Sequence, residues 1–152
     1  MEDPGQVFLD QNKLSEDGTS AVRIASWNEA GTVYAYGQSD KGSDWVTIKF
    51  KTFHGEELQD KLEKVRYSCL EWTKDGSGVF YNAYLTTNQN VDGTETTENA
   101  NQILFYHRIG TRQETDIQIA AFPNEPQWLS SAIVSDCGGY IILSIRYCPK
   151  AF

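Results

Sequence analysis

The sequence predicts an all-β protein: a partial β-propeller of antiparallel four-stranded blades that does not close into a ring. A motif made of an apolar residue, a short polar turn, a glycine and an aromatic or β-branched strand occurs three times, at residues 26–39, 71–84 and 133–146. The apolar anchors of the copies are separated by about 45 and then about 62 residues. A period in the forties that supplies four short strands is typical of propeller blades.

The first complete unit is expected at residues 21–65. Three of its strands are predicted at 21–27, 32–36 and 45–53, and apolar side chains alternate along the third, which places them on one face. The segment 58–65 is ambiguous, because its apolar residues also fit helical spacing and its Glu and Lys residues favour a helix. We predict a short strand or turn there.

The second complete unit is expected at residues 67–122. Its four strands are predicted at 67–72, 79–85, 102–109 and 116–122. The turn "KDGSG" between the first two supplies Asp and Gly for the positive φ angles of a tight hairpin. Residues 86–101 form a long polar insert rich in Thr and Asn.

Incomplete units are predicted on both sides of these two. Residues 6–10 are interpreted as the last strand of a preceding blade. Residues 128–146 are interpreted as the start of a following blade, with strands at 128–134 and 140–145. The chain is therefore expected to hold about two full blades and parts of two others, which cannot close a ring of typically four to eight blades.

Composition excludes several classes of protein. The formal charge is -8 and the pI about 4.7, which argues against binding to nucleic acid or to an anionic membrane, because both require a basic face. No apolar run reaches the length of a signal sequence or a membrane span. Three cysteines without a CxxC or Cys/His spacing predict neither a disulfide framework nor a zinc site. We expect a soluble, cytoplasmic protein without a metal or other cofactor.

The sequence contains no catalytic motif. Neither of its two histidines, His54 and His107, has a candidate nucleophile beside it in the sequence, and both are expected to be exposed polar residues near turns. Trp27, Trp72 and Trp128 recur near the ends of first strands and are predicted to pack in the core. Trp45, at a strand start, could instead present its ring at the surface.

Four segments in order carry a specific resemblance to a known family. They are "GSDWVTIKF" (42–50), "WTKDGSGVFYNAY" (72–84), "DGTETT" (92–97) and "FPNEPQW" (122–128). They closely resemble the propeller domain of prolyl oligopeptidase, also called prolyl endopeptidase, of serine peptidase family S9. The resemblance covers roughly residues 6–146.

The resemblance implies a cytosolic serine peptidase that cleaves short peptides after proline. In that family an α/β-hydrolase domain carries the Ser, Asp, His triad, and a seven-bladed propeller covers it and gates substrate entry. This sequence lacks the hydrolase domain, so the chain alone is predicted to be inactive. Its partners would be that domain and proline-containing oligopeptides. An independent binding module and a nonfunctional truncated product, suggested by the departure of "YCPKAF" from the family pattern, are the alternatives.

The resemblance also implies roles for individual residues. Asp44 matches an aspartate that faces the catalytic domain and pairs with an arginine there, so in this chain its carboxylate is expected to be solvated. Tyr67 and Leu129 match positions that line the specificity pocket beyond the proline subsite, where the family often has Phe and some members have Met. The insert at 86–101 resembles a loop proposed to gate entry, with its centre at Asp92, Gly93, Thr94, Glu95 and Thr96.

Overall fold

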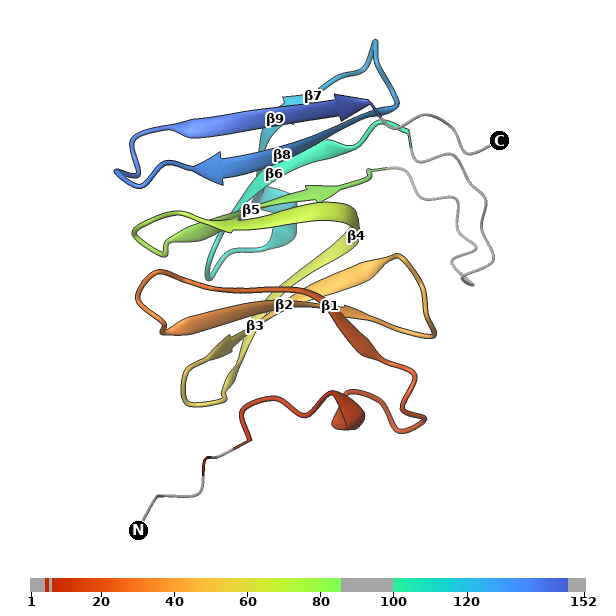
Figure 1. Ribbon diagram of the computed structural model, residues 1–152, viewed down its shortest axis with the longest axis vertical. Helices are drawn as coiled ribbons and strands as arrows, with labels where there is room; N and C mark the ends of the chain where they lie inside the picture. Colours follow the sequence, from red (N-terminus) through yellow and green to blue (C-terminus); the bar gives the residue numbers. More distant parts are fainter. Residues whose placement is uncertain (1–4, 6, 86–99, 148–152) are drawn as a thin grey trace.

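The computed structural model describes residues 5, 7–85 and 100–147, and its strands form two antiparallel sheets (Figure 1). The larger sheet has the strand order β1-β2-β3-β4-β5-β6-β7, and the smaller pairs β8 with β9. Two 3₁₀ turns, η1 (Gln11–Lys13) and η2 (Gln113–Thr115), precede β1 and β7. Within the described residues neither sheet closes, which confirms the predicted open, all-β architecture. The strands are β1 (Ala21–Trp27), β2 (Val33–Ser39), β3 (Val46–Thr52), β4 (Glu57–Trp72), β5 (Gly78–Ala83), β6 (Ile103–Arg108), β7 (Ile117–Ala121), β8 (Trp128–Val134) and β9 (Ile141–Tyr147).

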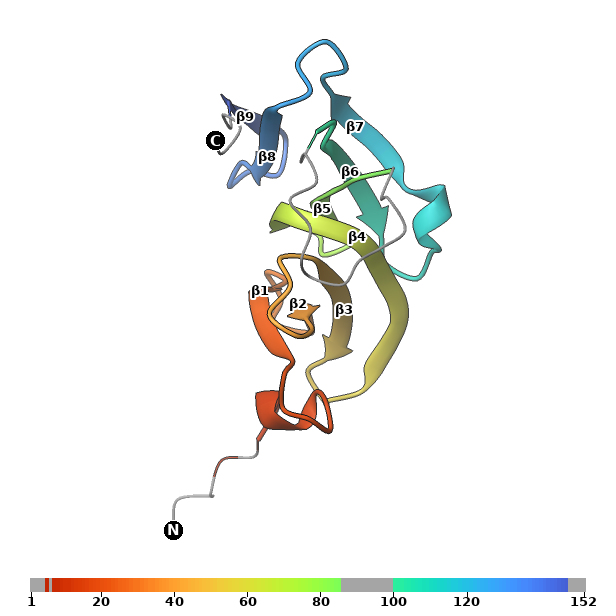
Figure 2. The same ribbon diagram turned by 90° about the vertical axis from the view of Figure 1, so that its right-hand side faces the viewer.

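The long strand β4 joins two blade-like groups of strands. The first group is β1, β2, β3 and the first half of β4; the second is the remaining half of β4 with β5, β6 and β7. The first half of β4 pairs with β3 and its second half with β5, and Figure 2 shows it curving from one group to the other. The pairing with β5 shifts register between Val65 and Leu70. The strand alternative for 58–65 was therefore correct, and two segments predicted separately are one strand. Leu62 and Val65 are fully buried against β3, so tertiary packing overrides helical propensity here.

The three copies of the sequence motif form the same turn. Gly31, Gly76 and Gly138 have φ angles of 66°, 69° and 69°. Each donates its N–H to the carbonyl of the residue three positions earlier, at 2.9, 2.9 and 2.8 Å. The left-handed conformation explains the glycine, because a side chain is disfavoured there. The internal repeat read from the sequence is thus a repeated hairpin turn.

The N-terminal segment differs from its prediction. Residues 7–10 of the expected strand at 6–10 are not in a strand, and Gln6 lies outside the described residues. Phe8 instead packs on Trp27 and Tyr34, with ring centroids 5.1 and 5.5 Å apart. The segment is held by these ring contacts. Its apolar residues therefore indicated packing, and they did not indicate a strand.

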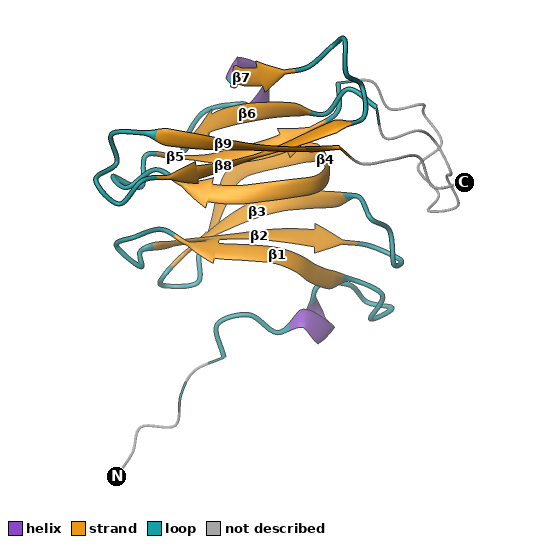
Figure 3. Cartoon of the chain, turned by 45° about the horizontal axis from the view of Figure 1, so that its top comes forward, coloured by secondary structure: helices purple, strands orange, loops and turns teal. Residues whose placement is uncertain are grey.

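The buried side chains form two clusters. The first lies within β2–β5 and includes Phe50, Leu62 and Trp72, while the second joins Phe80 and Leu104 to β8. Figure 3 shows the β8–β9 hairpin beside β4, β5 and β6. Core packing is confirmed for Trp72 and was wrong for Trp27, which is 40% exposed because one face of β1 is open. Trp128 is half-buried against Phe122.

His107 is completely buried, which corrects the prediction that it is exposed; His54 is exposed as expected. Nδ1 of His107 lies 2.7 Å from Asp116 and Nε2 lies 3.1 Å from Asp60, and both carboxylates are buried. Both ring nitrogens face ionisable acceptors, so the doubly protonated imidazolium satisfies the site best. The three residues connect β4, β6 and the end of η2, just before β7.

The pKa of His107 is raised by its surroundings. Burial alone would lower it, but the hydrogen bonds and charges of Asp116 and Asp60 outweigh burial. Tyr81 donates to the other oxygen of Asp116 at 2.7 Å, and the Gly110 N–H donates to Asp60. A raised pKa means that protonated His107 stabilises the fold fully below the unfolded pKa of about 6.5. That contribution is lost as the pH rises through the folded pKa.

We predict that His107→Leu lowers the free energy of unfolding by about 3–5 kcal/mol at pH 6, because it leaves two buried carboxylates without their cationic partner. It should also flatten the decline of stability with rising pH above about 6.5. Urea denaturation from pH 5.5 to 8.5 measures both effects. His54→Leu serves as the exposed control, and equal pH slopes in the two variants would contradict the role of His107.

Candidate functional site

Asp44 and Tyr67, two residues singled out from the sequence, lie together around Arg66. Asp44 precedes β3, whereas Arg66 and Tyr67 belong to the irregular part of β4. Nη2 of Arg66 donates to Oδ2 of Asp44 at 2.9 Å, and the Tyr67 hydroxyl donates to the same oxygen at 3.2 Å. We call Asp44, Trp45, Arg66 and Tyr67 the Arg66 cluster.

The guanidinium of Arg66 packs between two aromatic rings. Its Cζ lies 5.3 Å from the ring centroid of Trp45 and 4.9 Å from that of Tyr67, distances typical of cation–π contacts. Trp45 is half-buried and also packs edge-on against Tyr84. Arginine suits such a position because its planar group can stack and donate hydrogen bonds at once.

The prediction that Asp44 would be simply solvated was wrong. The hydrogen bond from Arg66 holds the pKa of Asp44 below its usual value, and Tyr67 adds to the effect. The Asp44 side chain is nevertheless 57% exposed, whereas that of Arg66 is 10% exposed. The carboxylate thus has a partner within its own chain and remains accessible from outside.

Tyr67 adopts an unusual backbone conformation. Its φ is 50°, a left-handed value that non-glycine residues rarely take, and the residue is 43% exposed. Nε2 of Gln102 donates to the carbonyl of Tyr67 at 3.0 Å and to that of Arg66 at 3.2 Å. The turned backbone is therefore held by the buried side chain of Gln102, the residue immediately before β6.

Leu129 lies on β8 and is buried. The N–H of the next residue, Ser130, donates to Oε1 of Gln102 at 3.1 Å. One side chain therefore connects the backbone at Tyr67 with the backbone beside Leu129. Sequence reasoning missed Arg66 and Gln102. A signal for Arg66 was its place directly before Tyr67, but nothing local marked Gln102 as a bridge.

The predicted gating residues, Asp92, Gly93, Thr94, Glu95 and Thr96, lie outside the described residues. Among the residues that the structure does describe, no group of three or more His, Cys, Asp or Glu side chains could hold a metal ion. No helix in the same part of the chain is long and apolar enough to cross a membrane.

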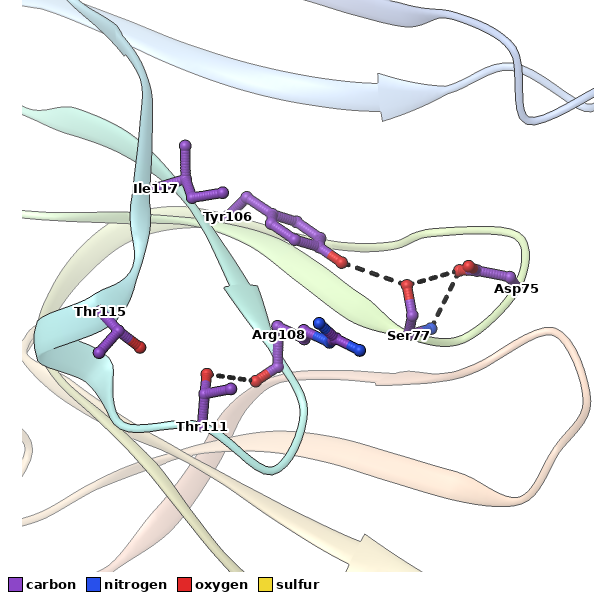
Figure 4. Close-up of a pocket in the computed structure, with 7 residues that line it drawn as sticks. All are labelled: Asp75, Ser77, Tyr106, Arg108, Thr111, Thr115 and Ile117. Carbon is purple, nitrogen blue, oxygen red and sulfur yellow. Dashed lines mark hydrogen bonds between the residues drawn. The ribbon is translucent and has the colours of Figure 1, made fainter.

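A separate shallow pocket of about 460 Å³ lies near the β4–β5 turn (Figure 4). Ser77 donates to Asp75 at 2.8 Å and lies 3.2 Å from the Tyr106 hydroxyl. Hydrogen bonds from Thr73 and Ser77 lower the pKa of Asp75 to about 2. These bonds close the hairpin turn, as expected for an Asp in such a turn, and the pocket shares no residue with the Arg66 cluster.

The fold and the site define a class: an open segment of an antiparallel β-propeller with a charged aromatic cluster where two blades join. The sequence profile of the family described as "Prolyl oligopeptidase, N-terminal beta-propeller domain" matches residues 2–148. The chain belongs to this family.

Individual relatives agree with this assignment. Prolyl oligopeptidase A of Amanita bisporigera is 33% identical over 154 residues, covering 91% of this chain and 20% of that protein. Prolyl endopeptidase of Elizabethkingia meningoseptica is 32% identical over 140 residues, covering 91% and 19%. A solved structure of prolyl oligopeptidase B from Galerina marginata, bound to a 35mer hydrolysis and macrocyclization substrate, superposes with a TM-score of 0.84 at 28% identity, covering 93% and 21%. The chain spans about a fifth of the length of the relatives it matches.

We predict a coupling energy of about 0.2–1 kcal/mol between Asp44 and Arg66, because one partner is exposed and water screens the pair. A double-mutant cycle of Asp44→Ala and Arg66→Ala, measured by urea unfolding at pH 7, gives this value. Arg66→Ala alone should cost more than Asp44→Ala, since it also removes packing against two rings.

The stability contributed by the Asp44–Arg66 pair should depend on pH. The lowered pKa of Asp44 means that its stabilisation is complete above the unfolded value of about 3.9 and is lost as the pH falls through the folded pKa. Glu16→Ala, which changes an exposed carboxylate in the segment before β1, is the control. A coupling energy of zero would show that the contact adds no net stability.

Proposed function

We propose that the chain is the non-catalytic propeller portion of a prolyl oligopeptidase, a cytoplasmic serine endopeptidase that cleaves short peptides after proline. In this proposal the propeller gates substrate entry, and the bond is cut by a separate α/β-hydrolase domain. The family membership over residues 2–148 carries the proposal. No observation favours the alternative of an independent binding module.

The geometry of Tyr67 supports a role in lining the substrate site. A left-handed backbone is costly for a tyrosine, and strained residues of this kind cluster at functional sites. The conformation leaves Tyr67 partly exposed. Gln102 donates to its backbone carbonyl, and Asp44 accepts from its hydroxyl. Leu129, connected through Gln102, would add an apolar contact to the same pocket.

The exposure of Asp44 supports contact with the hydrolase domain. A carboxylate has two oxygens and about four acceptor sites, and the hydrogen bonds from Arg66 and Tyr67 both go to Oδ2. The accessible Asp44 could accept a second cation from the other domain while keeping its pair with Arg66. The loop around residues 92–96 remains the candidate gate.

A chimera tests the proposal. This chain would replace the matching segment of the prolyl endopeptidase of Elizabethkingia meningoseptica, and hydrolysis of a prolyl peptide would be measured. We expect an active, monodisperse enzyme. A chimera that melts cooperatively like the parent but does not hydrolyse the peptide would contradict the proposed function.

Within the chimera, Tyr67→Ala should lower kcat/KM about tenfold or more for a peptide with a large apolar residue beyond the proline subsite, because an apolar contact is lost. Leu129→Ala should act in the same direction. Phe53→Ala, which truncates an exposed ring in the β3–β4 turn, should have no effect. Steady-state kinetics give the comparison, and equal values for all three variants would exclude the lining role.

A further inference from the structure

Gln102 is a buried amide with partners on two different sheets. It is 2% exposed, and its two N–H donors serve the carbonyls of Arg66 and Tyr67 on β4. Its Oε1 accepts from the N–H of Ser130 on β8. An amide has two donors and one acceptor oxygen, so every polar atom of this side chain is used. Removing it would leave buried backbone groups without partners, which is costly.

Asn82 is a second buried amide in the same region, with no exposed surface. Its Oδ1 accepts from the Cys69 N–H at 3.0 Å, and its Nδ2 donates to Oγ of Ser130 at 3.3 Å. Its own N–H donates to Oγ of Ser68 at 2.7 Å. Asn82 therefore also connects β4 with β8, and these three hydrogen bonds go to residues other than Tyr67.

The register shift in β4 explains why two amides are needed there. Val65 pairs with Ala83 and Leu70 with Tyr81, so residues 66–69 oppose Asn82 alone. Such a bulge leaves backbone groups outside the ladder, and these groups need other partners when buried. Gln102 serves the two carbonyls at the start of the bulge, where the chain turns left-handed at Tyr67.

We propose that Gln102 is a positioning residue, which fixes the spacing of Tyr67 and Leu129 and thereby the size of the peptide side chain accepted beyond the proline subsite. The inference rests on the proposed function, because it takes both residues to line that pocket. Its basis is that one rigid amide bonds the carbonyl of Tyr67 and the N–H of the residue that follows Leu129. Losing the bridge removes the hydrogen bonds that join these two backbone segments and leaves the side-chain bond from Asn82 to Ser130 between the bulge and β8.

The test measures selectivity in the chimera described above. Two peptides that differ only in a glycine or a phenylalanine beyond the proline subsite give a ratio of kcat/KM. We expect Gln102→Met, similar in volume but without the hydrogen bonds, to change this ratio at least fivefold. Gln102→Asn keeps the amide but is one methylene shorter, so we expect a similar change with less risk of unfolding.

Two controls separate positioning from stability. His107→Leu removes a buried side chain that shares no hydrogen-bond partner with Gln102; it should lower the melting temperature, yet leave the selectivity ratio within twofold. Gln118→Met changes an exposed glutamine on β7 and should affect neither quantity. If the Gln102 variants melt earlier but keep the parental ratio, Gln102 is merely structural and the inference is overturned.

Amide hydrogen exchange in the chain itself distinguishes this failure from failure of the proposed function. The Ser130 N–H should exchange at least tenfold faster in Gln102→Asn than in the parent, and unchanged protection would overturn the bridge without any activity assay. If exchange quickens as expected while Tyr67→Ala leaves catalysis unaffected, the bridge stands but the pocket-lining role and the positioning role that depends on it fall.

Discussion

The structure depends on the register shift within β4, where residues 66–69 leave the ladder opposite Asn82. Because the strand does not end there, β4 belongs to both blade-like groups. The two groups are therefore linked by the continuous backbone of β4 as well as by its hydrogen bonds to β3 and β5. Arg66 and Tyr67 lie in this shifted stretch, outside the paired positions of β4 and β5, and Tyr67 takes a left-handed backbone there. The candidate site is therefore a product of the junction between the groups.

Polar groups that would be costly inside a core stabilise this junction. Arg66 is held by a carboxylate and two rings, and Gln102 uses all its polar atoms on backbone groups. In the first half of β4, Asp60 bonds His107, which also bonds Asp116. Buried polar networks of this kind favour a single arrangement, since a shifted register would leave them unpaired. These networks therefore fix the register of the strands at the junction as well as stabilising it.

The strands and hairpin turns were predictable because their signals are local: alternating apolar residues and a glycine at a fixed place. The continuity of β4, the burial of His107 and the pair formed by Asp44 were not, because each arises from long-range contact. His107 meets Asp60 across 47 positions in the sequence, and Arg66 meets Asp44 across 22. Family resemblance singled out Tyr67 and Leu129 as candidates, but no sequence pattern marks Gln102, the side chain that connects their backbones.

The strand β9 has a consequence for how the isolated polypeptide behaves. All its residues are exposed, and its aliphatic side chains, such as Ile142 and Ile145, make this edge of the two-stranded sheet apolar. Among the described residues β9 pairs only with β8, and an edge strand of this kind can pair with a strand of another molecule. At high concentration the polypeptide would therefore self-associate through this edge. Lysine substitutions along β9 would keep it monomeric, because charged side chains oppose edge-to-edge pairing.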